Sequence, residues 1–198
     1  MAKGRSNSQP GWTDVKAELA DFDRAALLGL VHDLYVARKD NQAFLHARFG
    51  LGEDVLGPYR KTIDRWLWPD VLRRQNTSVS KAKQAIADYK KALGDAEGVA
   101  ELMVFYCERA AGFSRAVSHD DAGYFDALLR MFAQALRMIR ALPDNVQDAL
   151  IVRLESVRDI SREFGYGVVD EMDVLLSQFV SARGRVMKID DAKGDMVG

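Results

Sequence analysis

Apolar residues recur at intervals of three and four along most of the chain, the spacing that places side chains on one face of an α-helix. Runs in which Val, Ile or Thr alternate with polar residues between turn residues, the signature of strands, are missing. The pattern therefore predicts an all-α fold. The helical stripes lie near residues 27–35, 44–49, 55–67, 82–93, 99–113, 124–139, 146–160 and 168–179.

The links between these segments are short, among them "SHDD", "LPDN" and "FGYG". Short links favour antiparallel packing of consecutive helices, so we expect a compact bundle of about seven or eight helices. The stretch "AIADYKKAL" resembles the second helix of a tetratricopeptide repeat. No partner-helix pattern recurs 34 residues away, the period of such repeats. Solenoid-like stacking is therefore the alternative to the bundle.

Length and composition predict one helical domain over residues 12–183, because 198 residues that are 48% hydrophobic supply one sizeable core. Residues 1–11 and 184–198 are polar and lack a sustained helical period, so we expect a disordered N-terminal tail and a flexible C-terminal tail. No apolar run reaches the roughly 18 to 20 residues of a membrane span. The single cysteine, Cys107, fits a reducing compartment. These features favour a cytoplasmic protein without a membrane partner.

The segment "SVSKAKQAIADYKKALGD" has the clearest helix boundaries, with Ser78 as N-cap and Gly94 near the C-cap. Its first turn carries Lys81 and Lys83, although the helix dipole is already positive there. Three interpretations stay open. The lysines are solvated, they face a carboxylate of this chain or a partner, or they bind a phosphate group beside the free N–H groups of the first turn.

Charge is segregated along the sequence. Between Tyr59 and Lys91 there are nine basic and three acidic residues, a net +6 in a chain whose total is −1. Trp68 lies on the cationic side of the helix expected there and offers either a stacking aromatic or a buried packing residue. We define the basic surface as the candidate binding site made of Arg60, Lys61, Arg65, Trp68, Arg73, Arg74, Ser78, Ser80, Lys81 and Lys83.

No arrangement of residues predicts catalysis, a metal or a cofactor. The three histidines lack the spacing of zinc ligands, and Cys107 lies on or beside an apolar stripe, as a structural cysteine does. Glu101 and Glu108 are seven residues apart and share a helix face, yet the Glu-x-x-His repeats of a di-metal bundle are missing. An active site assembled from distant residues would show as a deep pocket holding two or more of His32, Glu101, Glu108 and His119.

Several stretches together resemble a family of small bacterial all-helical proteins of unknown function. They are Trp12 with "VKAEL", then "LYVARKDNQAFLHARF", "YRKTI", "SKAKQAIADYKKALGD" and "ELMVFYCE", within residues 12–140. The resemblance implies a bacterial, cytoplasmic protein and no particular activity or site residue.

The expected function is that of an interaction module that binds a protein partner, or a second copy of itself, through the basic surface. Segregated charge suits contacts of this kind. Binding of nucleic acid or of a phosphate ligand by the same surface is the alternative, because several basic residues in one region can contact phosphates. An enzyme whose site is invisible in the sequence is the third.

Overall fold

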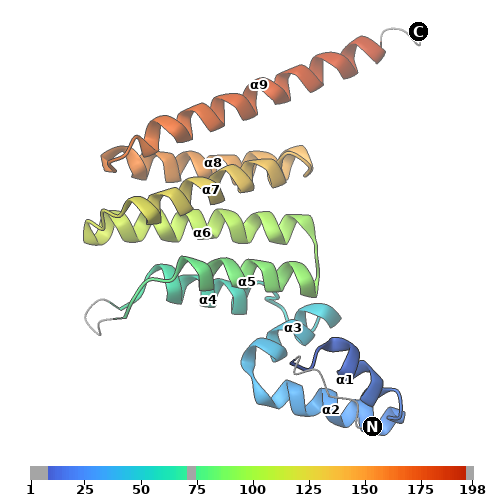
Figure 1. Ribbon diagram of the computed structural model, residues 1–198. Helices are drawn as coiled ribbons and strands as arrows, with labels where there is room; N and C mark the ends of the chain where they lie inside the picture. Colours follow the sequence, from blue (N-terminus) through green and yellow to red (C-terminus); the bar gives the residue numbers. More distant parts are fainter. Residues whose placement is uncertain (1–8, 71–74, 195–198) are drawn as a thin grey trace, which may run out of the picture. The chain divides into compact units, whose positions relative to one another are not determined.

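The computed structural model describes residues 9–70 and 75–194, with side chains described up to residue 183, and confirms the all-α prediction. Within these residues there are nine α-helices, one short 3-10 helix and no strand (Figure 1). The helices are α1 (Trp12–Leu19), α2 (Arg24–Ala37), α3 (Lys39–Phe49), α4 (Gly57–Leu67), α5 (Val79–Ala92), α6 (Ala96–Val117), α7 (Ala122–Ile139), α8 (Asp144–Ile160), η2 (Ser161–Glu163) and α9 (Val168–Gly194).

The contacts within the chain separate into two units, residues 1–45 and 46–198, where the sequence predicted one helical domain over 12–183. Helix α9 continues to Gly194, past residue 184, at which the flexible tail was expected to begin. None of the helices in the described residues combines the length and the apolar composition that crossing a bilayer requires.

The first unit holds α1, α2 and the start of α3. Asp23 is the N-cap of α2, and its Oδ1 accepts a hydrogen bond from the N–H of Ala26 at 2.7 Å. At the other end of α2, Asn41 donates a 2.6 Å hydrogen bond to the carbonyl of Leu34. Neither α1 nor α2 contains a buried residue. The apolar stripe expected at 27–35 forms on a helix of the first unit.

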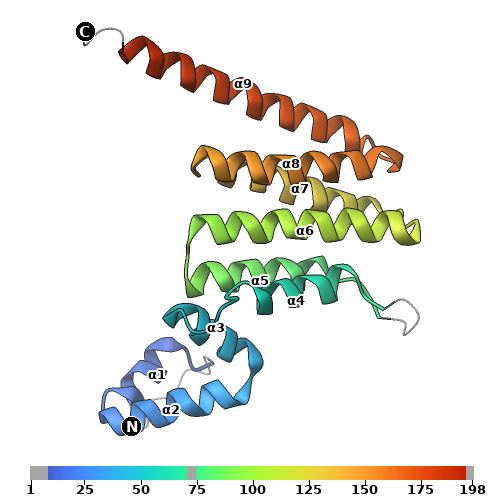
Figure 2. The same cartoon turned by 180° about the vertical axis from the view of Figure 1, so that it is seen from behind.

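The second unit is a stack of helices in chain order (Figures 1 and 2). Neighbours in sequence pack as pairs, α4 with α5 and α6 with α7. Alternate helices also pack together, namely α4 with α6, α6 with α8 and α7 with α9. Contacts of this kind arise when helical hairpins stack side by side. The compact all-α fold predicted from the sequence is confirmed, and its helices lie in layers that follow chain order.

Helix α6 runs through the middle of this stack and is buried on several sides. The expected stripe is buried at Val99, Leu102, Tyr106 and Phe113. Residues outside this stripe, among them Val104 and Cys107, are buried as well, because α6 packs against α4, α5, α7 and α8. Small residues along α6 let these neighbours approach closely. They are Gly98, Ala100, Ala110 and Ala111.

Of the two capping residues predicted for α5, Gly94 lies at the end of the helix as expected, whereas the Ser78 side chain does not cap its start. Gly94, with φ +74°, ends α5 in the left-handed conformation that glycine adopts without steric cost. Asp95 then caps α6 by accepting hydrogen bonds from the N–H groups of Glu97 at 3.2 Å and Gly98 at 2.9 Å. Ser78 stands at the N-cap of α5, but its side chain does not cap the helix; its hydroxyl lies 3.3 Å from that of Ser80.

Candidate functional site

Two arginines and two glutamates form a chain of ion pairs across α4, α6 and α8. Arg60 on α4 donates a hydrogen bond from Nη2 to Oε1 of Glu101 on α6 at 2.9 Å. Arg153 on α8 contacts the other oxygen of Glu101 through Nη1 at 2.5 Å. The same guanidinium also binds Glu108, which lies about two helical turns further along α6. Its Nε is 2.7 Å and its Nη2 2.8 Å from the carboxylate oxygens of Glu108. We call these four residues the charge ladder.

The charge ladder follows from the geometry of α6. Residues seven apart lie on one face of a helix, so Glu101 and Glu108 both face the gap between the helices on either side, from which Arg60 and Arg153 reach them. All four side chains are partly buried, between 20% and 34% exposed. Bonding to Glu108 first, and then to Glu101, raises the pKa of Arg153, although burial opposes this. The guanidinium therefore remains charged at any pH the fold survives.

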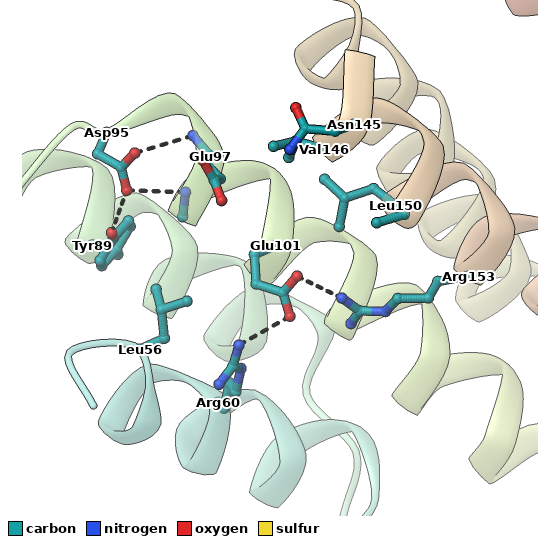
Figure 3. A pocket seen from close by; sticks show the side chains of 12 residues that line it. Leu56, Arg60, Tyr89, Asp95, Glu97, Glu101, Asn145, Val146, Leu150 and Arg153 are labelled. Carbon is teal, nitrogen blue, oxygen red and sulfur yellow. Dashed lines mark hydrogen bonds and ion pairs between the residues drawn. The ribbon is translucent and has the colours of Figure 1, made fainter. Parts of the chain in front are cut away.

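A pocket of about 530 Å³ opens beside the charge ladder, between α4, the start of α6 and α8 (Figure 3). Glu101 faces it between Arg60 and Arg153 (Figure 3). The remaining lining residues divide into an apolar set and a polar set. The apolar set is Leu56, Gly98, Val146, Ala149 and Leu150. The polar set is Tyr89, Asp95, Glu97 and Asn145.

The inner end of the pocket is fixed by Tyr89. Its buried hydroxyl donates a 2.7 Å hydrogen bond to Oδ2 of Asp95, the residue that caps α6. Burial first, and then this hydrogen bond, raises the pKa of Tyr89 above its ordinary value. Gly98 lets the two groups meet, since a Cβ at this position would lie 2.1 Å from the Tyr89 hydroxyl oxygen. These hydrogen bonds link the end of α5 to the start of α6 at one side of the pocket.

Two of the residues considered for catalysis, Glu101 and Glu108, meet on Arg153, but the pocket does not hold two of the four. Of His32, Glu101, Glu108 and His119, this pocket is lined by Glu101 alone. His119 packs among rings at another place, 4.9 Å from Tyr124 between centroids. Within the described residues, no group of three or more metal-ligating side chains comes together. Cys107 is fully buried, and burial above all raises the pKa of its thiol, so it lacks the accessible thiolate that a nucleophile needs.

The structure distributes the predicted basic surface over separate places. Arg60 belongs to the charge ladder, and Lys61 is exposed to solvent. Arg65 and Lys81 both lie over the ring of Trp66, with the guanidinium carbon 5.3 Å and the ammonium nitrogen 3.9 Å from the ring centroid. A cation over the face of a tryptophan is attracted by its quadrupole. Lys81 therefore has a partner within the chain other than the carboxylate or phosphate considered from the sequence.

The second lysine of the first turn has different surroundings. Lys83 is half-buried, and burial first, then the nearby charge of Arg130, lowers its pKa. Arg130 is itself paired with Asp126 at 2.8 Å. The start of α5 thus holds two lysines beside the uncapped first turn, with Ser78 half-buried and Ser80 exposed. Arg73 and Arg74 lie outside the described residues.

Trp68 combines the two alternatives that the sequence left open. Its ring packs against α6, with its centroid 6.3 Å from that of Phe113, and a Cβ at Gly112 would lie 2.6 Å from the ring. Arg109 covers the ring at 4.1 Å, yet 36% of the residue remains exposed. Trp68 is therefore a packing residue of the α4–α6 contact with one accessible edge.

Sequence reasoning missed the pocket and the role of Arg153. The shared face of Glu101 and Glu108 was a usable signal, because two carboxylates on one face of a central helix require cations from its neighbours. Which helices supply them depends on the stacking order. Comparison with known protein families, curated proteins and solved structures finds no match for this chain.

Proposed function

We propose that this chain is a helical interaction module, without chemistry of its own, that binds a segment of a partner protein in the pocket between α4, α6 and α8. The observation that carries the proposal is the pocket itself. Its volume of about 530 Å³ suits one or two side chains, and it joins apolar walls to charged groups. Stacked helical hairpins commonly present such surfaces to extended partners.

The charges of the pocket favour a partner segment that places a basic group beside an apolar side chain. Both arginines of the pocket are already bonded to carboxylates, Arg60 to Glu101 and Arg153 to Glu101 and Glu108. Glu97 stands exposed at the rim, so negative charge exceeds positive charge along this face. Complementary charge at the rim contributes to specificity and to the rate of association.

From the sequence we expected a protein partner or a second copy on the basic surface, with nucleic acid or a phosphate ligand as the alternative. The second candidate is that alternative, binding of nucleic acid or a phosphate ligand by the basic surface. Its specific support is the concentration of Lys81, Lys83 and Arg130 around the uncapped start of α5, where burial and Arg130 lower the pKa of Lys83. An anion there would offset the repulsion between the cations and accept hydrogen bonds from the free backbone N–H groups of the first turn. The cytoplasm is the proposed location of either activity, as the lone buried cysteine suggests.

The two candidates are separated by affinity capture from bacterial cytoplasmic extract with matched variants. Ala149→Arg fills the pocket from an exposed lining position, and Val174→Arg adds the same charge on α9, which supplies no lining residue. A protein captured by the wild type and by Val174→Arg, but lost with Ala149→Arg, supports the pocket. If Ala149→Arg and the wild type capture the same proteins in the same amounts, the pocket is not the binding site.

The basic surface is tested with labelled mixed-sequence RNA and DNA at two salt concentrations. Binding that weakens steeply with salt, and is lost in a Lys81→Glu, Lys83→Glu double variant of unchanged helicity, would favour the second candidate. Absence of binding by the wild type would remove it and leave the pocket.

A further inference from the structure

Glu97 continues the acidic stripe of the charge ladder by one more turn of α6. It precedes Glu101 by four residues and Glu108 by eleven, so the three carboxylates share one face of the helix. Glu101 and Glu108 are bonded to arginines of the neighbouring helices. Within residues 9–70 and 75–183, no hydrogen bond or ion pair joins the exposed Glu97 carboxylate to another side chain. The stripe therefore carries one carboxylate more than the ladder has cations.

The helices on either side keep a fixed register with α6. α4, α6 and α8 all begin beside the pocket, so the three helices run in the same direction (Figures 1 and 3). Arg60 lies 41 residues before Glu101, and Arg153 lies 52 residues after it. Because the helices run in the same direction, a step of four residues on each leads from the level of Glu101 to the next level.

At the level of Glu97 the two arginines have apolar counterparts. The same separations lead from Glu97 to Leu56 on the side of α4 and to Ala149 on α8. Both residues line the pocket, and Ala149 is exposed. The pocket therefore lies where one more arginine would extend the charge ladder and neutralise its third carboxylate.

The chemistry of the pocket favours an arginine over a lysine. Leu56, Val146 and Ala149 can cover the methylene groups of a long cationic side chain whose charged end lies on Glu97. A guanidinium forms two parallel hydrogen bonds with a carboxylate and is more weakly hydrated than an ammonium group. Arg153 makes such a pair of bonds to Glu108, in the same stripe.

We infer that the partner protein inserts an arginine into the pocket, where its guanidinium pairs with Glu97 as that of Arg153 pairs with Glu108. The inference rests on the proposed function, because it names the side chain of the partner that the pocket binds.

Two acetylated dipeptide amides, Leu-Arg and Leu-Lys, test the inference by titration into the isotope-labelled full chain. The backbone amide signals of Gly98 and Ala149 report binding in the pocket by nuclear magnetic resonance. We expect Leu-Arg to shift both signals and to bind at least about fivefold more tightly than Leu-Lys. Glu97→Gln should weaken the binding of Leu-Arg about tenfold, because it removes the charge-assisted pair.

The matched control is Glu171→Gln. It also removes the charge of an exposed glutamate in the first turn of a helix, but Glu171 lies on α9 and does not line the pocket. This variant should bind Leu-Arg as the wild type does. Equal affinities for the two dipeptides, wild-type affinity in Glu97→Gln, or unshifted signals of Gly98 and Ala149 with Leu-Arg would each overturn the inference.

A second measurement needs no added ligand. Ala149→Arg supplies the guanidinium from α8, at the separation from Glu97 that Arg153 has from Glu101. Measured by urea denaturation, it should lower the unfolding equilibrium constant about threefold more in the wild-type chain than in Glu97→Gln. Equal effects in the two chains would overturn the pairing with Glu97. The proposed function fails by a different result, unchanged capture of partner proteins by Ala149→Arg.

Discussion

Arg153 donates two parallel hydrogen bonds to Glu108, from Nε to Oε1 at 2.7 Å and from Nη2 to Oε2 at 2.8 Å. The two residues are 45 positions apart in sequence, one on α8 and one on α6. Two bonds between planar groups fix orientation as well as distance. The pair therefore sets how α8 lies against α6 beside the pocket.

Replacement of Arg153 by alanine should lower the free energy of unfolding by about 2 kcal/mol. It removes three hydrogen bonds and leaves Glu101 and Glu108 partly buried, with one cation fewer between them. Urea denaturation measures the loss. The control is Arg162→Ala, because Arg162 is 65% exposed and is paired with Asp159, three residues earlier; it should cost about 0.5 kcal/mol or less. Equal losses in the two variants would contradict a structural role for the charge ladder.

The positions of the helices could be predicted because each signal is local. The stripes over 99–113 and 124–139 have the helical period, and α6 and α7 are buried along them. Gly94 and Asp23 mark helix ends through their own backbone preference and hydrogen bonding. The stripe over 27–35 shows the limit of the method. Its period predicted α2, but period alone does not say what covers a helix face.

The pocket could not be predicted because its groups are distant in sequence. Arg60 and Glu101 are 41 residues apart, and Glu101 and Arg153 are 52 apart. Only the stacking of alternate helices brings them together. Proximity in sequence does not by itself place side chains on one side of a helix. Residues close in sequence, such as Arg60 and Arg65, point from different sides of α4 and meet Glu101 and Trp66 respectively.

Two glycines on helices should respond oppositely to alanine. A Cβ at Gly98 would lie 2.1 Å from the Tyr89 hydroxyl oxygen and 2.5 Å from Oδ2 of Asp95. Gly98→Ala should therefore destabilise the fold by about 1 to 3 kcal/mol, as overpacking does. At Gly29 on α2 a Cβ meets nothing within 4 Å, so Gly29→Ala should stabilise α2 by up to about 1 kcal/mol.

Thermal unfolding followed by circular dichroism compares the two glycine variants. Loss of stability in Gly98→Ala, with none in Gly29→Ala, is the expected result. A neutral Gly98→Ala would mean that the contact between Tyr89 and Asp95 relaxes without cost, and that the pocket end is not rigid.

Lys81 should stabilise the protein through the ring of Trp66, in spite of its unfavourable place at the start of α5. Replacement by alanine removes the cation 3.9 Å from the ring centroid and should cost about 0.5 to 1 kcal/mol. Lys90→Ala, an exposed lysine in the last turn of the same helix, is the control for losing one charge and one long side chain. Chemical denaturation measures the free energy of unfolding of both variants. A Lys81→Ala variant as stable as the wild type would mean that the ammonium group is solvated and that its contact with the ring contributes nothing.

Stability should fall at alkaline pH because the fold keeps protons on buried groups that the unfolded chain releases. Burial is the main cause that raises the pKa of Tyr106 and Tyr124 above the ordinary 10.0, and of Cys107 above the ordinary 9.0. Above those ordinary values the unfolded state binds fewer protons than the folded state, so the free energy of unfolding decreases as pH rises, by up to about 1.4 kcal/mol per pH unit for each group.

The alkaline slope can be assigned to individual tyrosines by substitution. Tyr106→Phe removes one of these protons, so its free energy of unfolding should fall less steeply than that of the wild type above pH 10. Below pH 8 the two proteins should differ by a constant offset, because the phenol is protonated in both the folded and the unfolded state. Urea titrations at a series of pH values give both slopes. If the free energies of unfolding of the two proteins run parallel up to pH 11, the Tyr106 phenol has the same pKa in the folded and the unfolded state. That result would mean that α6 opens to solvent around Tyr106 before the chain unfolds.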